Sequence, residues 1–474
     1  MDGLRRREFL GGAASALLAP THGNSAPTRP PNIVFVMADD LGYRDLGCYG
    51  QKQIRTPNID RLASEGLRFT DAYAGCTICA PSRSVLMTGY HMGHTSVRSN
   101  PGGVPLLAKD VTVGEVLKGA GYKTGVFGKW GLGDIGTDGV PWKQGFNEFF
   151  GYLHQVHAHF YYPEFLYRNG ERYPLPGNGN GRRTTYSHDA IAAQALDFIK
   201  RNRNQPFFCY VPFTTPHLEL LVPEDSIDPY RGKFPEKPYR DPRNHYAPQD
   251  TPRAAYAAMI TRMDRDVGRI LALIESLGLD NNTIVFFTSD NGAATPLWKD
   301  DYFGSTGGLR GHKQNFYEGG IRTPFVARWP GRIQAGSETG HLCSFYDVLP
   351  TLAELAGIRK IPKTDGLSLV PTLLGSGDQP RHEYLYWELP RYDAKTRQFA
   401  KEIPRQALRM GDWKVVRPEP DGPLELYDLE TDIAETRNVA AEQPAVMAKV
   451  QQFLKEARTE PRPQTQPEPG EWTK

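Results

Sequence analysis

Four short runs of apolar residues are continuous along the chain and do not alternate with polar positions. Runs of this kind indicate strands buried on both faces of a mainly parallel sheet. Helical patterns separate them, and the longest begins at Thr251-Pro252, a cap followed by a first-turn proline, and ends before Gly278. The pattern predicts strands over residues 32–37, 122–127, 206–213 and 283–288, and helices over residues 57–65, 113–119, 187–201 and 251–277.

The alternation of strands and helices predicts an α/β fold, with a large, mainly parallel mixed sheet flanked by helices. The pattern changes after residue 375. Short antiparallel strands are predicted there, followed by a helix over residues 444–458. We therefore expect a large domain over residues 31–375 and a small C-terminal antiparallel β plus helix subdomain over residues 376–459. Its predicted strands cover residues 383–388, 406–410, 413–416 and 424–427.

Polar residues of unusual type follow each of the four buried strands. They are Asp39-Asp40, Gly128-Lys129-Trp130, Pro216-His217 and Asp290-Asn291-Gly292. Any one of these has an ordinary explanation as a cap, a turn or a surface group. Ligands of open α/β sheets gather at the carboxyl ends of the strands, however, so the four groups are expected to converge on one site.

Composition narrows the functional classes. The 474 residues include 56 basic and 54 acidic side chains, and a net charge of +2 gives no global field that would attract nucleic acid. Five cysteines are too few for a disulfide scaffold. After the N-terminus no apolar run is long enough to span a bilayer, so no stable membrane span is expected.

The N-terminus has the pattern of a targeting segment. Arg5-Arg6-Arg7-Glu8-Phe9-Leu10 precedes a small, apolar stretch over residues 11–19, which matches a twin-arginine export signal; a flexible basic tail is the alternative. We expect a signal peptide over residues 1–26, a linker over residues 27–30, export by the twin-arginine machinery, and a periplasmic or secreted protein. The proline-rich residues 460–474 are expected to be a disordered tail.

A second sequence feature is the run Cys79-Ala-Pro-Ser-Arg83. Pro81 is suited to the first turn of a helix, which places Cys79 at a helix N-terminus, where the macrodipole favours an anion. Arg83 then lies one turn further on and faces the same anion. Two simpler interpretations remain open from these residues alone: a buried structural cysteine, or a redox pair of Cys79 with Cys76.

Extended to Gly89, this run resembles the signature of type I sulfatases, in which the cysteine is oxidised to formylglycine. The resemblance covers about Pro31 to Asn438 and is to arylsulfatase-like members of the alkaline phosphatase superfamily. The Cys79 run is the most specific part, and the other matching motifs begin at Ala38, Thr56, Gly128, Ser289, Tyr317, Asp347, Asp365 and Leu426.

The resemblance implies an alkaline phosphatase-like fold and a set of site residues. It implies that formylglycine is made from Cys79 by a formylglycine-generating enzyme, and that Arg83 and Lys129 hold its hydrate. His217 and Lys313 would contact the sulfate and its leaving oxygen. One divalent cation, calcium with magnesium as the alternative, would be bound by hard oxygen ligands at Asp39, Asp40, residue 79, Asp290 and Asn291.

The resemblance therefore implies a sulfuric ester hydrolase that releases inorganic sulfate from an aryl or carbohydrate sulfate ester. A sulfated carbohydrate is the expected natural substrate, and the Pro- and Tyr-rich residues 222–249 are expected to form a wall of its pocket. Two alternatives are a phosphate or phosphonate monoester hydrolase using the same site, and a non-catalytic sulfoglycan-binding protein.

One position departs from the family pattern. Many members read Gly-Lys-Trp-His, whereas this chain has Gly131 in place of the histidine. The nearby His154, His157 and His159 are the candidates for replacing it, as a proton relay or as substrate contacts. His157 is the first choice for the missing base, and His157 and His159 are the expected substrate contacts; an interfacial loop of aromatic residues is the simpler interpretation.

Overall fold

The computed structural model describes residues 29–243, 245–393 and 395–463. The predicted signal peptide (1–26), the first half of the predicted linker and residues 464–474 of the predicted tail lie outside the described residues. Within the described part, no helix has both the length and the apolar character needed to cross a membrane.

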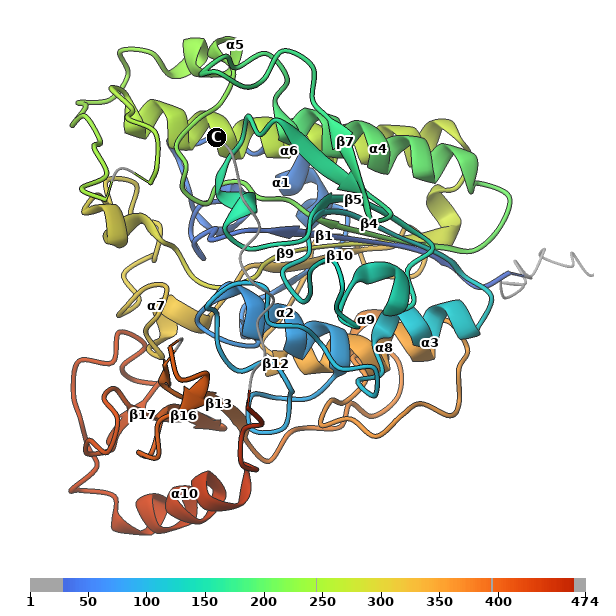
Figure 1. Ribbon diagram of the computed structural model, residues 1–474. Coiled ribbons are helices and arrows are strands. Elements are labelled where there is room, and N and C mark those ends of the chain that lie inside the picture. Colours follow the sequence, from blue (N-terminus) through green and yellow to red (C-terminus); the bar gives the residue numbers. More distant parts are fainter. Residues whose placement is uncertain (1–28, 244, 394, 464–474) are drawn as a thin grey trace, which may run out of the picture.

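A ten-stranded mixed sheet forms the centre of the large domain (Figure 1). Its middle strands β9, β1, β8, β4 and β5 are parallel to one another, and β10 is antiparallel to β9. The strand order across the sheet is β11 (Ser337–Thr339), β2 (Leu67–Phe69), β10 (Phe325–Arg328), β9 (Thr283–Ser289), β1 (Asn32–Ala38), β8 (Phe207–Pro212), β4 (Lys123–Lys129), β5 (Glu148–Tyr152), β6 (Phe165–Arg168) and β7 (Glu171–Pro174).

The central strand β1 is buried over its whole length because each face packs on a separate apolar core. Ile33, Phe35 and Met37 belong to one core, and the alternate residues Val34 and Val36 belong to the other. A strand with apolar residues at every position is therefore the pattern that this environment requires. The predicted α/β fold with a mainly parallel sheet is confirmed.

Helices cover both faces of the sheet (Figure 1). On one face lie α1 (Pro57–Ser64), α4 (Ser187–Arg201), α5 (Glu224–Ile227) and α6 (Pro252–Ser276). On the other face lie α2 (Cys79–Thr88), α3 (Val113–Gly119), α8 (Val348–Leu355) and α9 (Val370–Leu374). Pro252 occupies the first turn of α6, as predicted, but the side chain of the preceding Thr251 makes no capping hydrogen bond. At α3, Thr112 forms a capping box with Glu115. Shorter elements are β3 (Ala72–Tyr73), β12 (Cys343–Ser344) and α7 (Glu318–Ile321).

The C-terminal subdomain is a four-stranded antiparallel sheet with one helix against it. The strand order is β13 (Leu385–Leu389), β16 (Arg405–Met410), β17 (Trp413–Arg417) and β18 (Glu425–Asp428), and the helix is α10 (Pro444–Glu456); β14 (Tyr392–Asp393) and β15 (Gln398–Phe399) form a separate hairpin. The predicted antiparallel β plus helix architecture is confirmed, whereas the exact domain boundaries at residues 375 and 459 stay a prediction.

A buried ion cluster joins the subdomain to the large domain. Lys414 on β17 donates to Glu318 at 2.7 Å and to Glu435 at 3.3 Å, and none of the three side chains is exposed. Arg310 reaches the same region, where it donates to the Tyr427 hydroxyl and to the Glu435 carbonyl. The segment between residues 310 and 318, which contains Lys313, is therefore anchored on the C-terminal subdomain.

Candidate active site

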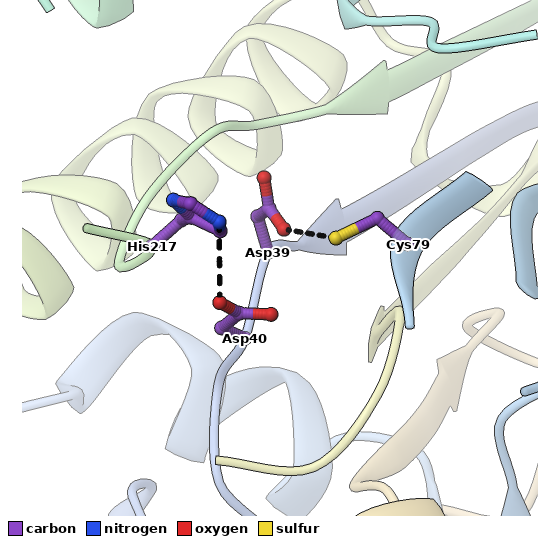
Figure 2. A group of neighbouring side chains, drawn as sticks. All are labelled: Asp39, Asp40, Cys79 and His217. Atoms are coloured by element: carbon purple, nitrogen blue, oxygen red, sulfur yellow. Dashed lines mark hydrogen bonds and ion pairs between the residues drawn. The ribbon is translucent and has the colours of Figure 1, made fainter. Parts of the chain in front are cut away.

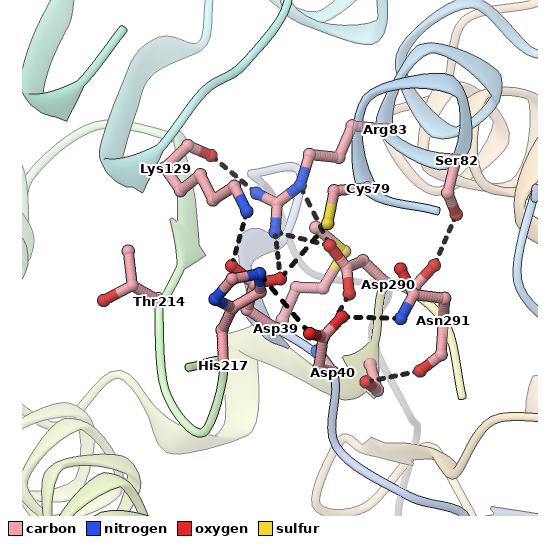
Figure 3. Close-up of polar contacts among 12 residues, drawn as sticks. Asp39, Asp40, Cys79, Ser82, Arg83, Lys129, Thr214, His217, Asp290 and Asn291 are labelled. Carbon is pink, nitrogen blue, oxygen red and sulfur yellow. Dashed lines mark hydrogen bonds and ion pairs between the residues drawn. The ribbon is translucent and has the colours of Figure 1, made fainter. Parts of the chain in front are cut away.

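The polar groups that follow the four buried strands converge at one edge of the sheet, as predicted (Figure 3). Asp39 and Asp40 follow β1, Asp290 and Asn291 follow β9, and His217 lies in the loop after β8. Lys129 is the last residue of β4, and the N-terminus of α2 brings Cys79 and Arg83 to the same place. Parallel strands produce this convergence because their carboxyl ends share one edge.

Three carboxylates and three cations are paired one to one in this site. Lys129 Nζ lies 2.7 Å from Asp39 Oδ2, and Lys313 Nζ lies 2.7 Å from Asp40 Oδ2. The third pair is Arg83 with Asp290, whose Oδ2 accepts from Nη2 at 2.7 Å and from Nε at 3.1 Å. All six side chains are buried. Because three negative charges are paired with three positive ones, the six side chains together carry no net charge.

Cys79 is the first residue of α2 and is 1% exposed. Its thiol donates towards Asp39 Oδ1 at 3.5 Å, and Lys313 Nζ lies 3.6 Å from the sulfur. Burial raises the pKa of the Cys79 thiol far above its usual value, although Lys129 and Lys313 oppose this shift. The unmodified side chain is therefore a neutral thiol rather than a thiolate. All five cysteines lie in the described part of the chain and are free, so Cys79 is not paired with Cys76.

The donor set around Asp40 fits a hard divalent cation. Figure 2 shows Asp39, Asp40, Cys79 and His217, whose ligand atoms lie within 4.8 Å of one another. Asn291 adds a fully buried amide oxygen, Oδ1, that has no hydrogen-bond partner within the described residues. Carboxylate and amide oxygens of this kind are ligands for calcium or magnesium. The carboxylate of Asp290 differs from those ligands because both of its oxygens already accept hydrogen bonds, Oδ2 from Arg83 and Oδ1 from the Asp40 N–H.

A second cluster, His91 with His94 and Asp365, has metal-like composition but does not fit a metal. Nδ1 of His91 accepts a hydrogen bond from the Gly93 N–H at 3.1 Å, so a neutral ring carries its proton on Nε2. That proton points to Asp365 Oδ2, 3.6 Å away. The cluster is therefore a hydrogen-bonded network at the C-terminal end of α2.

His217 is held so that Nε2 faces the site. Its Nδ1 contacts the Leu218 carbonyl, and Nε2 lies 3.5 Å from Asp40 Oδ2. The Tyr161 hydroxyl fixes this loop by donating to the carbonyls of Thr214 and His217. Burial lowers the pKa of His217 well below its usual value, and Lys313 and Lys129 lower it further. His217 is consequently neutral at neutral pH until an anion approaches.

The three histidines of the 154–159 segment have different environments. His159 lines the cavity above Cys79, stacks on His217 with ring centroids 4.8 Å apart, and places Nδ1 2.9 Å from Nε2 of His245. His157 instead packs among Tyr152 and Phe165 and does not line that cavity. The first choice, His157, is therefore not brought to the site, whereas His159 is. His154 also lies outside the cavity lining, and its Nδ1 accepts from the Val156 N–H.

Cys79 and Lys313 open into a cavity of about 1190 Å³. Part of its wall comes from the 222–249 segment, as predicted, and part from the C-terminal subdomain. Its aromatic lining residues are Tyr239, Tyr246, Trp298 and Tyr392, and its outer cations are Lys237, Arg240, Arg243, Lys299, Arg391 and Arg405.

Two residues of the site were not anticipated from the sequence. Gln155 lines the cavity as a buried amide, and His245 contacts His159 from the 222–249 segment. Nothing in the sequence singles out Gln155, because a glutamine in a loop is usually exposed. The density of histidines and tyrosines in both segments was the only available signal for the contact between His159 and His245.

Comparisons with known proteins show the family to which this chain belongs. The family profile described as Sulfatase matches residues 31–358, and one described as N-sulphoglucosamine sulphohydrolase, C-terminal, matches residues 311–463. The chain is 37% identical to human arylsulfatase A over 421 residues, which is 81% of this chain and 76% of the relative.

Two solved structures show the same fold. The crystal structure of Ps i-CgsB in complex with k-i-k-neocarrahexaose has a TM-score of 0.75 at 28% identity and covers 90% of this chain and 93% of its own. The phosphonate monoester hydrolase of Agrobacterium radiobacter has a TM-score of 0.67 at 22% identity, and the match covers 90% of this chain and 95% of the hydrolase. This likeness concerns the fold alone. The family profile covers more than half of the chain, so the protein belongs to the sulfatase family and is an enzyme of that family.

Proposed function

We propose that this sulfatase hydrolyses sulfate esters of carbohydrates through a formylglycine formed from Cys79, with calcium as its cation. The observation that carries the proposal is the one-to-one pairing of Asp39, Asp40 and Asp290 with three buried cations around Cys79. When present, formylglycine supplies an oxygen nucleophile and the cation supplies positive charge beside it. Asp39, Asp40, Asp290, Asn291 and residue 79 are the proposed ligands.

The charge balance favours a sulfate ester over a phosphate ester. The three carboxylates and three cations cancel, so a divalent cation adds two positive charges to a buried site. A sulfate monoester carries one negative charge and leaves one positive charge to stabilise an ionised nucleophile. A phosphate monoester is a dianion at neutral pH and would neutralise both charges. The charge balance therefore ranks a phosphate monoester hydrolase second. A phosphonate monoester carries a single negative charge, like a sulfate monoester, so charge does not separate the two; that alternative is supported only by a shared fold.

Lys129 and Lys313 are proposed to stabilise negative charge on the nucleophile and on the sulfate oxygens. Burial opposes the charge on Lys313, but Asp40, Cys79 and Asp39 together outweigh burial, and the pKa of Lys313 is raised well above its usual value. Lys313 is therefore a fixed charge. His217 can change protonation, because an arriving anion favours its charged form, and is the proposed proton donor to the leaving oxygen.

The cavity supports a carbohydrate substrate. Aromatic rings and cations on its walls suit sugar faces and additional anionic groups, and its volume exceeds what a small aryl sulfate requires. A formylglycine-generating enzyme is the proposed partner for modification, and the twin-arginine machinery the proposed route to the periplasm or the medium.

The decisive experiment measures kcat/KM for p-nitrophenyl sulfate, p-nitrophenyl phosphate and a panel of sulfated oligosaccharides, using enzyme coexpressed with a formylglycine-generating enzyme and the Cys79→Ala variant as control. We expect a higher value for sulfate than for phosphate and no turnover in the variant. A higher value for phosphate would favour the second candidate. Binding without sulfate release by fully modified enzyme would support a non-catalytic sulfoglycan-binding protein.

A further inference from the structure

The position that lacks the family's histidine is occupied in space by another residue. Gly131 follows β4 and donates its N–H to the Leu153 carbonyl at 3.0 Å, which places it beside the loop after β5. Its φ of +77° is one that residues with a Cβ rarely adopt. A Cβ built at Gly131 would lie 2.0 Å from Gln155 Nε2 and 2.8 Å from Cδ. The Gln155 amide thus fills the space into which a side chain at residue 131 would project.

Gln155 is buried, with 3% of its surface exposed, yet neither of its amide atoms has a hydrogen-bond partner within the described residues. Buried amide groups in native proteins are nearly always paired, because an unpaired one retains its full desolvation cost. Gln155 lines the same cavity as Cys79 and Lys313. An unpaired donor on the wall of a cationic cavity is suited to an anionic oxygen of a ligand.

We propose that Gln155 positions the substrate, with Nε2 donating a hydrogen bond to an oxygen of the sulfate group. This inference rests on the proposed sulfatase function. A carboxamide neither releases nor accepts a proton near neutral pH, so Gln155 takes the place of a histidine at residue 131 without its acid–base chemistry. Proton transfer then stays with His217, and Gln155 contributes to binding and orientation alone.

Binding of inorganic sulfate tests this without turnover. Titration calorimetry is done in the Cys79→Ala background with calcium present, comparing Gln155→Met and Gln155→Glu with the parent. Loss of a hydrogen bond to a charged group should weaken sulfate binding by on the order of 10-fold in Gln155→Met. Gln155→Glu should weaken it more, because it adds a negative charge to the cavity wall.

Gln144→Met is the matched control, since Gln144 is also buried but donates to the carbonyls of Leu107 and Asp138, away from the cavity. It should bind sulfate like the parent. In modified enzyme, Gln155→Met should raise KM for p-nitrophenyl sulfate and leave the pH profile of kcat unchanged.

Sulfate affinity within twofold of the parent in both Gln155 variants, or a shifted pH profile in Gln155→Met, overturns the inference. Thermal unfolding of each variant shows whether the fold is kept, and Gln155→Met carries the test if Gln155→Glu does not fold. If the parent enzyme hydrolyses sulfate esters and the variants bind sulfate normally, only this inference fails. If the parent hydrolyses none, the proposed function fails instead.

Discussion

Asp290→Ala should destabilise the metal-free protein by about 3–5 kcal/mol, because it leaves a buried guanidinium without its partner. Arg83 is 1% exposed and makes two hydrogen bonds to Asp290 Oδ2. The nearest other carboxylate, Asp39, is 3.8 Å away and already pairs with Lys129. Loss of the hydrogen bond from the Asp40 N–H to Asp290 Oδ1 adds about 1 kcal/mol. The same variant should lose calcium binding and sulfatase activity together.

Urea unfolding in excess chelator measures this cost, since chelation removes the stabilisation that a bound metal would add. The double variant Asp290→Ala/Arg83→Met is the control: it should recover most of the lost stability and none of the activity, because the unpaired charge is gone while the ligand is still missing. If Asp290→Ala unfolds at the parent's urea midpoint, the proposed cost of the unpaired Arg83 is wrong. If the double variant is no more stable than the single one, the cost has another origin.

Four further outcomes follow from the site. In active enzyme, the tryptic peptide ending at Arg83 should be about 18 Da lighter at Cys79, and mass spectrometry showing an intact thiol there would contradict the mechanism. His217→Ala should lower kcat by about 10²–10⁴-fold for sulfated sugars and much less for p-nitrophenyl sulfate, whose leaving group needs no proton; equal losses would argue against a proton donor. Burial lowers the pKa of His157 to about 3, so the unfolded imidazole binds a proton below its usual pKa and the native one does not. The stability that His157 contributes is thus present above about pH 6.5 and falls with decreasing pH. The parent should therefore lose more unfolding free energy between pH 7 and pH 5 than His157→Leu, by about 2 kcal/mol, and the variant should retain kcat. Gly131→His should lower both activity and thermal stability, because its backbone conformation is strained and its Cβ meets Gln155; a faster enzyme would show that the site merely lacks a base.

The sequence predicted the elements and their convergence because both depend on local patterns. Asn32–Ala38 and Thr283–Ser289 are apolar on both faces, which identifies central strands, and the parallel topology brings Asp39 and Asp290 to one edge. The antiparallel strand β10 and the edge strand β11 were not predicted, since three or four residues carry too little pattern.

The sequence could not predict which of His157 and His159 faces the cavity, for a different reason. Both belong to one 3₁₀ turn, and which ring faces the cavity is decided by packing against Phe165 on β6 and His217 after β8, far apart in the chain. Gln155 was missed similarly, because its environment follows from the absence of a side chain at Gly131.

The anchoring of residues 310–318 on the C-terminal subdomain has a consequence for how such enzymes are recombined. Arg391 and Arg405 contribute to the cavity from the subdomain, and Lys414 holds Glu318 just beyond Lys313. A chimera that exchanges only residues 376–459 with a relative would replace the part of the cavity wall that comes from the subdomain. It would keep the native segment around Lys313, whose contacts were made with the original subdomain. To transfer substrate specificity from a relative, residues 310–322 should therefore be exchanged together with the subdomain, although more than fifty residues separate the two in the sequence.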